Sequence, residues 1–84
     1  MATVTFSTEA AEQAAGLPKA IRVRLLAVVE RLEKWPAVSG VKALRGALAG
    51  FFWIRTGDYR IRFRIEGELV VIGKIGHRRD FYED

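Results

Sequence analysis

The feature of this sequence that most constrains its fold is a strict alternation between residues 59 and 65. Apolar or aromatic side chains stand at every second position from Tyr59 onward, and arginines fill the positions between them. Successive side chains of a β-strand point to opposite faces of a sheet, so this strand has one apolar face and one cationic face. The segment therefore predicts a strand in a sheet that is covered on one side only, with its arginines on the open side.

The dipeptide Gly57-Asp58 fixes how this strand pairs with the segment before it. Glycine and aspartate between two strand-like segments are typical of a two-residue hairpin turn. A turn of this length places Ile54 opposite Ile61, whereas a loop of odd length would place Ile54 opposite an arginine. Residues 51–56 therefore form the partner strand, and its side chains on the arginine side are Phe51, Trp53 and Arg55.

A second hairpin adds one more cation to the same side. We expect a three-residue loop at 66–68, which pairs Ile65 with Leu69. The same register carries Lys74 to a position opposite Arg60. The predicted basic face comprises Phe51, Trp53, Arg55, Arg60, Arg62, Arg64, Lys74 and, past the strand end, Arg78.

Positive charge is concentrated in this part of the chain. Residues 42–79 hold nine Lys and Arg against three Asp and Glu, whereas the whole chain has 14 against 10 and a net charge of +4. Phosphates would supply the missing counter-charge, and an indole can stack on a base. We interpret the face as a nucleic-acid site, to which Lys42 and Arg45 add charge. The alternative is a solvated face whose arginines keep the sheet from aggregating.

The first half of the chain predicts elements that cover the apolar face. Residues 3–6 favour a strand, and Ser7 is placed to cap a helix that runs to Ala15. A second helix opens at Pro18 and ends before Pro36, with apolar residues at three- and four-residue steps. The remaining expected strands are 41–44, 51–56, 59–65 and 69–75.

The composition excludes several classes of site. The 84 residues favour one domain, residues 1–84. With no cysteine and one histidine, the chain offers neither a disulfide nor a Cys- or His-rich metal centre. No apolar run approaches the ~20 residues of a membrane span, and the N-terminus lacks the pattern of a signal peptide. We expect a cytoplasmic protein with no metal, no cofactor and no membrane partner.

Four segments carry a resemblance to a known family: Leu17-Pro18-Lys19, Val41-Lys42-Ala43-Leu44-Arg45-Gly46, Arg55-Thr56-Gly57-Asp58-Tyr59-Arg60 and Gly76-His77-Arg78-Arg79-Asp80-Phe81-Tyr82. In this order and spacing they resemble the RelE/ParE toxin superfamily, and within it the RelE-like messenger-RNA endonucleases. The resemblance covers nearly the whole chain. Its most specific part is RxGDYR followed by GHRRDxY near the C-terminus.

The resemblance implies an α+β, RelE-like fold: a strand, a two-helix hairpin, and then a curved, mostly antiparallel sheet of three to four strands. It also implies the toxin of a type II toxin–antitoxin system, blocked by a cognate antitoxin. RelE-like members cut mRNA in the A site of the 70S ribosome without a metal ion. The 2′-OH attacks the adjacent phosphate, and the 5′-oxygen leaves.

The resemblance also assigns catalytic roles to five residues. Arg60 and Arg78 match arginines of the family pattern. Tyr82 matches a C-terminal tyrosine, and Arg55 falls where a family lysine stands. His77 occupies a position that is often basic in the family, and it can supply an acid/base function because an unperturbed imidazole titrates near neutral pH.

Trp53 departs from the family pattern, because another lysine can stand there. The departure removes one cation, and the indole is expected to stack a base instead. It keeps two alternatives open: a ParE-like toxin that inhibits DNA gyrase and is not an enzyme, and a degenerate RNA-binding module. A toxin is expected to pair with an antitoxin whose acidic or amphipathic segment folds across the basic face. The residues assigned to RNA binding are Trp53, Arg62, Arg64, Lys74, Lys42 and Arg45.

Overall fold

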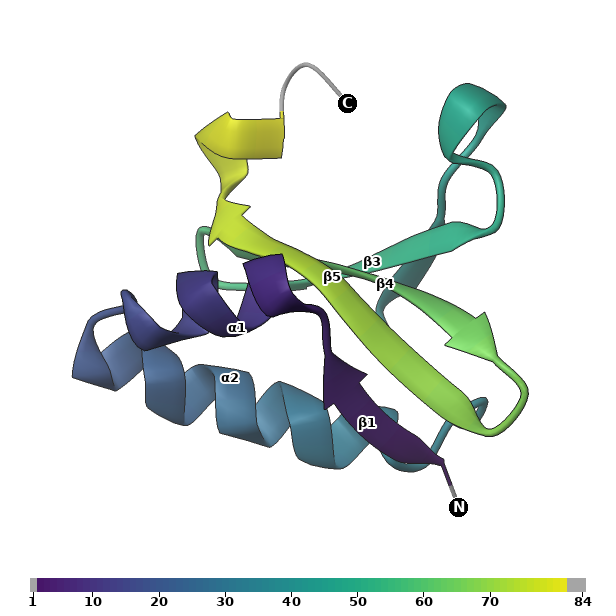
Figure 1. The fold of residues 1–84 in the computed structure, drawn as a ribbon, viewed down its shortest axis with the longest axis horizontal. Helices are drawn as coiled ribbons and strands as arrows, with labels where there is room; N and C mark the ends of the chain where they lie inside the picture. The colour runs from purple at the N-terminus through teal and green to yellow at the C-terminus, as the bar shows by residue number, and fades with distance from the viewer. Residues whose placement is uncertain (1, 82–84) are drawn as a thin grey trace.

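The computed structural model describes residues 2–81, which form a five-stranded sheet with two helices on one of its faces (Figure 1). In chain order the elements are β1 (Thr3–Phe6), α1 (Thr8–Ala15), α2 (Lys19–Leu32), β2 (Val41–Ala43), the 3₁₀ helix η1 (Gly46–Leu48), β3 (Phe51–Thr56), β4 (Tyr59–Glu66), β5 (Leu69–His77) and the 3₁₀ helix η2 (Arg78–Phe81). The predicted α+β fold class is confirmed. No helix among the described residues is long and apolar enough to cross a membrane.

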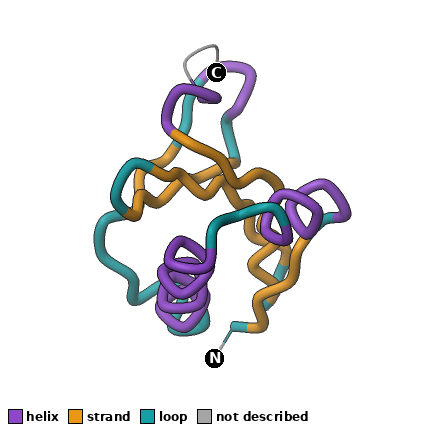
Figure 2. Tube along the Cα trace, turned by 90° about the vertical axis from the view of Figure 1, so that its left-hand side faces the viewer, coloured by secondary structure: helices purple, strands orange, loops and turns teal. Residues whose placement is uncertain are grey.

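The strand order in the sheet is β1-β5-β4-β3-β2. The last four strands in the sequence pair antiparallel, as expected, and β1 joins them by pairing parallel with β5. A parallel neighbour requires a crossover connection, and the pair α1 and α2 lies within the connection that follows β1. Both helices lie on one side of the sheet, as Figures 1 and 2 show from two directions.

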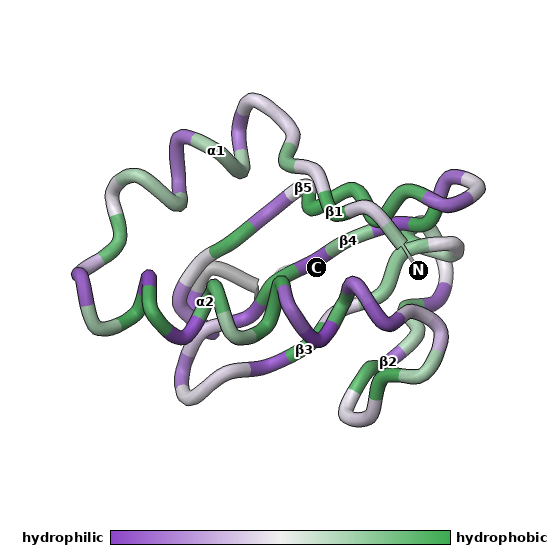
Figure 3. Tube along the Cα trace, turned by 90° about the horizontal axis from the view of Figure 1, so that it is seen from below, coloured by the Kyte–Doolittle hydropathy of each residue, from purple (hydrophilic) through white to green (hydrophobic). Residues whose placement is uncertain are grey.

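The helix ends follow the local signals of the sequence. The Ser7 hydroxyl accepts a hydrogen bond from the backbone N–H of Ala10 at 3.1 Å, which caps α1. Helix α2 ends at Leu32, three residues before the predicted limit, because the chain turns there and brings Trp35 over the sheet. Along α2, hydrophobic and hydrophilic segments alternate in Figure 3, as expected for a helix with one face on a core.

The core lies between these helices and the apolar face of the sheet. Phe63 is fully buried, and its ring centroid lies 5.7 Å from that of Phe52 and 5.5 Å from that of Trp35. Edge-to-face aromatic pairs add about 0.5–1.5 kcal/mol beyond the burial of their area. The residues of α2 that are buried against this cluster and its neighbours are Leu25, Val28 and Leu32.

The first hairpin has the predicted register. Ile54 lies opposite Ile61, and Thr56 lies opposite Tyr59. Gly57 adopts φ +60°, which glycine reaches without the steric cost that other residues incur. The two-residue turn therefore sets which side chains of β3 and β4 face the core.

The predicted register of the second hairpin is wrong, because its turn holds two residues, 67–68, in place of three. Lys74 consequently lies opposite Arg62 rather than opposite Arg60. It still lies on the arginine side, since Gly73 is left unpaired in a bulge that shifts the alternation by one residue. Two deviations from the predicted pairing thus cancel at this position.

Candidate nucleic-acid interface

The face of the sheet that is turned away from α1 and α2 carries the cationic side chains. In Figure 1, α2 lies below the sheet, whereas η1 and η2 rise above it at its two ends. We call this surface the basic face; the register assigns to it Lys42, Phe51, Trp53, Arg55, Arg60, Arg62, Arg64 and Lys74.

Two arginines of the predicted catalytic set, and the backbone of a third, come together where β3 turns into β4. Arg55 and Arg60 lie opposite each other next to this turn. The backbone N–H of Arg78 donates to the carbonyl oxygen of Asp58 in the turn at 2.7 Å, which ties the start of η2 to the same place. Gly76 stands opposite Arg60, so β5 contributes no side chain there. We call this region the turn end of the basic face.

The guanidinium of Arg60 lies over the indole of Trp53. Its Cζ is 4.3 Å from the ring centroid, within the range of a cation–π contact. The Nζ of Lys42 approaches the same ring at 5.9 Å. The Nε of Arg60 is buried and has no hydrogen-bond partner. Base stacking by Trp53 stays a prediction, and in the structure the guanidinium of Arg60 lies over its ring.

Positive charge is weaker at the other end of the basic face. The Nε of Arg64 donates to the carboxylate of Glu66 at 2.5 Å, and both side chains are about half exposed. Arg62, opposite Lys74, has its Cζ 5.6 Å from the ring centroid of Phe51. Sequence reasoning missed the neutralising role of Glu66. The signal was present, because a residue two positions along a strand lies on the same face.

Three other predicted site residues lie away from the basic face or outside the described residues. His77 lies opposite Tyr59, so its ring is on the opposite side of the sheet from the arginines, with a centroid distance of 5.6 Å to the tyrosine ring. Its Nδ1 accepts a hydrogen bond from the backbone N–H of Arg79 at 3.3 Å. Arg45 is exposed and directly precedes η1. Tyr82 lies outside the described residues.

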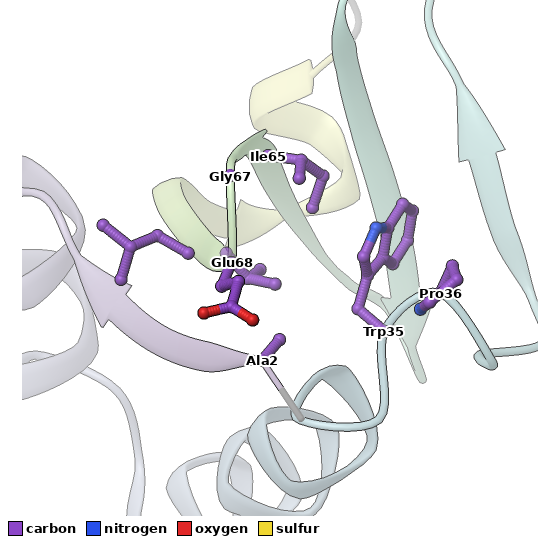
Figure 4. Close-up of a pocket in the computed structure, with 8 residues that line it drawn as sticks. Ala2, Trp35, Pro36, Ile65, Gly67 and Glu68 are labelled. Atoms are coloured by element: carbon purple, nitrogen blue, oxygen red, sulfur yellow. The ribbon is translucent and has the colours of Figure 1, made fainter.

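A pocket of about 180 Å³ lies on the helix side, near the turn between β4 and β5 (Figure 4). Trp35 forms one wall, and Glu68 and the neighbouring Ala2 lie across from it. None of the predicted site residues is among the residues that line it. The candidate site is therefore the basic face and not this pocket.

The basic face is suited to binding phosphates. A guanidinium can donate two parallel hydrogen bonds to phosphate oxygens, and fixed cations stabilise negative charge that develops during a reaction. Among residues 2–81, no three His, Cys, Asp or Glu side chains are grouped as a metal ion would require. The chemistry that the basic face offers is anion binding and charge stabilisation.

Comparisons with known proteins agree with one another. The family model for the ParE toxin of the type II toxin–antitoxin system parDE matches residues 4–82. The chain is 43% identical to Toxin RelG of Mycobacterium tuberculosis over 86 residues, covering 95% of this chain and 94% of RelG. It is similar to a chain of the toxin–antitoxin complex RelBE2 of the same organism, with a TM-score of 0.81, 35% identity, and coverage of 92% and 98%.

The isolated RelE toxin of E. coli has the same fold. Its TM-score is 0.77 at 18% identity, and the match covers 92% of this chain and 84% of that one.

Proposed function

This chain belongs to the RelE/ParE superfamily of toxins from type II toxin–antitoxin systems, and we propose that it is a ribosome-dependent endonuclease that cuts mRNA in the A site without a metal ion. One observation carries the proposal: Arg55, Arg60 and the start of η2 at Arg78 meet at the turn end of the basic face. A phosphate held there would lie against the face that carries Arg55 and Arg60.

The proposed reaction is an internal transesterification. The 2′-oxygen of one nucleotide forms a bond to phosphorus, and the bond from phosphorus to the 5′-oxygen of the next nucleotide breaks. The 2′-OH loses its proton to a base, and the leaving oxygen gains one from an acid. The products are a 2′,3′-cyclic phosphate and a 5′-hydroxyl. Negative charge grows on the phosphate oxygens in the transition state, which is where fixed guanidinium groups contribute most.

We assign the charge stabilisation to Arg60 and Arg78, with Arg55 beside them. The proton transfers are assigned to Tyr82, which matches the C-terminal tyrosine of the family pattern. A phenol works as a base only where nearby cations favour its ionised form, and the cations nearest to Tyr82 in the sequence are Arg78 and Arg79. We do not assign acid/base work to His77, because its ring lies beside Tyr59, on the side of the sheet away from the arginines. We propose instead that its bond to Arg79 holds the start of η2.

Primer extension on translated messages tests the proposal. We expect new 5′ ends within codons when wild-type protein is added to a translating extract, and no such ends with Arg60→Gln. Arg22→Gln serves as the charge-matched control, because Arg22 lies on α2, on the other side of the sheet from the basic face. Identical uncut patterns for the wild type and Arg60→Gln would overturn the proposal.

Inhibition of DNA gyrase is a second candidate. The matching family model is that of the ParE toxin, and Trp53 replaces a cation of the RelE-like pattern. Supercoiling by purified gyrase in the presence of excess protein separates the two. We expect no inhibition, and inhibition together with intact messages would favour this candidate.

We also propose a cognate antitoxin whose acidic or amphipathic segment folds across the basic face. The similar RelBE2 protein was solved as a toxin–antitoxin complex, which supports a partner of this kind. Charge complementarity predicts that association is fast and slows as salt is raised. Co-purification with the product of a neighbouring small reading frame tests this. A partner whose association rate does not change with salt would contradict the proposed contact.

A further inference from the structure

The contact between Trp53 and Arg60 follows from the register of β3 and β4. Trp53 lies opposite Arg62, and Arg55 lies opposite Arg60, so Trp53 and Arg60 are diagonal neighbours on the basic face. Aromatic and long side chains reach each other across such a diagonal. Phe51 and Arg62 repeat the same diagonal offset, with a looser contact of 5.6 Å against 4.3 Å.

Like charges around Arg60 repel its guanidinium and work against a single fixed orientation of the side chain. Arg55 lies directly opposite, and a lysine in place of Trp53 would add a second like charge on the diagonal. A tryptophan has the reverse effect, because the face of its ring attracts a cation. Trp53 removes one cation from the family pattern, and it also holds Arg60, a cation that remains.

The burial of one nitrogen determines which edge of the guanidinium is left for a ligand. The Nε of Arg60 is buried without a hydrogen-bond partner, a state that costs free energy unless another contact offsets it. The indole supplies that contact. With Nε covered, Arg60 can offer a phosphate only the edge formed by its two terminal nitrogens.

We propose that Trp53 is a positioning residue: its ring holds the Arg60 guanidinium so that the two terminal nitrogens face a phosphate on the basic face. This inference rests on the proposed function for the identity of the ligand as an RNA phosphate. The orientation of Arg60 itself does not depend on it. The role differs from base stacking, because the ring face is used by a protein cation.

The orientation is tested directly by the NMR signal of the Arg60 Nε–H. In the wild type we expect a signal that exchanges with water at least about tenfold more slowly than those of exposed arginines, since a buried N–H is protected. Trp53→Leu abolishes this protection, and Trp53→Phe weakens it. Phe51→Leu is the matched control on the same strand and face, and it leaves the Arg60 signal unchanged. An Arg60 signal that is the same in the wild type and in both Trp53 variants overturns the inference.

A double-mutant cycle tests the consequence for the reaction. Trp53→Leu is expected to lower kcat by about tenfold with little change in KM, the size of a cation–π contact in a partly desolvated site. In an Arg60→Lys background, which lacks the planar group, the same substitution changes kcat by less than about twofold. Equal effects in both backgrounds would assign Trp53 a role independent of Arg60 and overturn the inference. A wild type that cuts no message refutes the proposed function, while the NMR result still decides the orientation.

Discussion

The two faces of this sheet are built from the same strands and have opposite physical roles. On β4, Ile61 and Phe63 are at most 1% exposed and lie against the helices, whereas Arg60, Arg62 and Arg64 point to the side without helices. The core face stabilises the fold by burial. The basic face opposes it, because Arg55 lies opposite Arg60 and Arg62 opposite Lys74. A substitution should therefore lower stability on one face and function on the other.

The largest effect is expected for Phe63→Ala on the core face. The ring is fully buried and contacts both Trp35 and Phe52, so its removal leaves a cavity that the aromatic cluster cannot fill. Such truncations cost about 3–5 kcal/mol of unfolding free energy. Urea denaturation followed by circular dichroism measures the change. A loss below about 1 kcal/mol would mean that the site collapses around the smaller side chain.

Arg60→Gln on the basic face should show the reverse pattern. We expect mRNA cleavage to fall by about 10²–10³-fold, the size typical of removing one preorganised donor to a developing charge. The unfolding free energy should change by less than about 1 kcal/mol, because the substitution removes both the repulsion from Arg55 and the contact with the Trp53 ring. Cleavage rates and denaturation midpoints on the same preparation check both parts. A parallel loss of stability and activity would place Arg60 in the fold and not in the site.

Gly57→Ala tests the turn that sets both faces at once. Gly57 has φ +60°, and a Cβ there would lie 2.7 Å from a terminal nitrogen of Arg24. The left-handed backbone costs a non-glycine residue about 1–2 kcal/mol. We expect a loss of stability of this size, with the β3–β4 register retained because Ile54 and Ile61 still match. Hydrogen exchange of the β4 amides would reveal a slipped register instead.

Sequence reasoning succeeded at the first hairpin, where the local pattern and the turn agreed. It failed at the second hairpin, where the turn is one residue shorter than predicted and a bulge interrupts the pairing. The register of β3 and β4 followed from Gly57-Asp58 and the alternation. The bulge at Gly73 could not be predicted from the alternation. β1 pairs with β5 only as far as Ile72, and beyond that residue α1 contacts the edge of β5. There the side-chain oxygen of Gln13 accepts the backbone N–H of Ile75 at 2.7 Å. No pattern within residues 69–77 predicts the hydrogen bond to Gln13, which is 62 positions away from Ile75.

The candidate site also has one part that the sequence predicts and one part that it does not. Alternation and the first turn were enough to place Arg55 and Arg60 on one face. Lys74 reaches the same face only because the shorter second turn and the bulge at Gly73 cancel. The contact between Arg60 and Trp53 depends on side-chain directions across a diagonal, which residue types alone do not determine. The role of Tyr82 stays a prediction, since that residue lies outside the described part of the chain.

The smallest effect is expected for Glu66→Gln, which changes the far end of the basic face. The pair of Glu66 with Arg64 is about half exposed, so its loss should alter the unfolding free energy by less than about 1 kcal/mol. The freed charge of Arg64 becomes available to an RNA phosphate. The slope of log affinity for single-stranded RNA against log salt should therefore steepen by about 0.7, the value for one added phosphate contact.

Glu68→Gln is the matched control for this change, because Glu68 lies at the adjacent turn and lines the pocket on the helix side. It removes the same charge at a position away from Arg64. If the two variants steepen the slope equally, RNA responds to the net charge of the domain. If only Glu66→Gln does so, RNA passes over Arg64, and the binding surface extends from the turn end along the whole length of β4. The second result is expected, because the ion pair lies on the face that carries the other arginines and Glu68 does not.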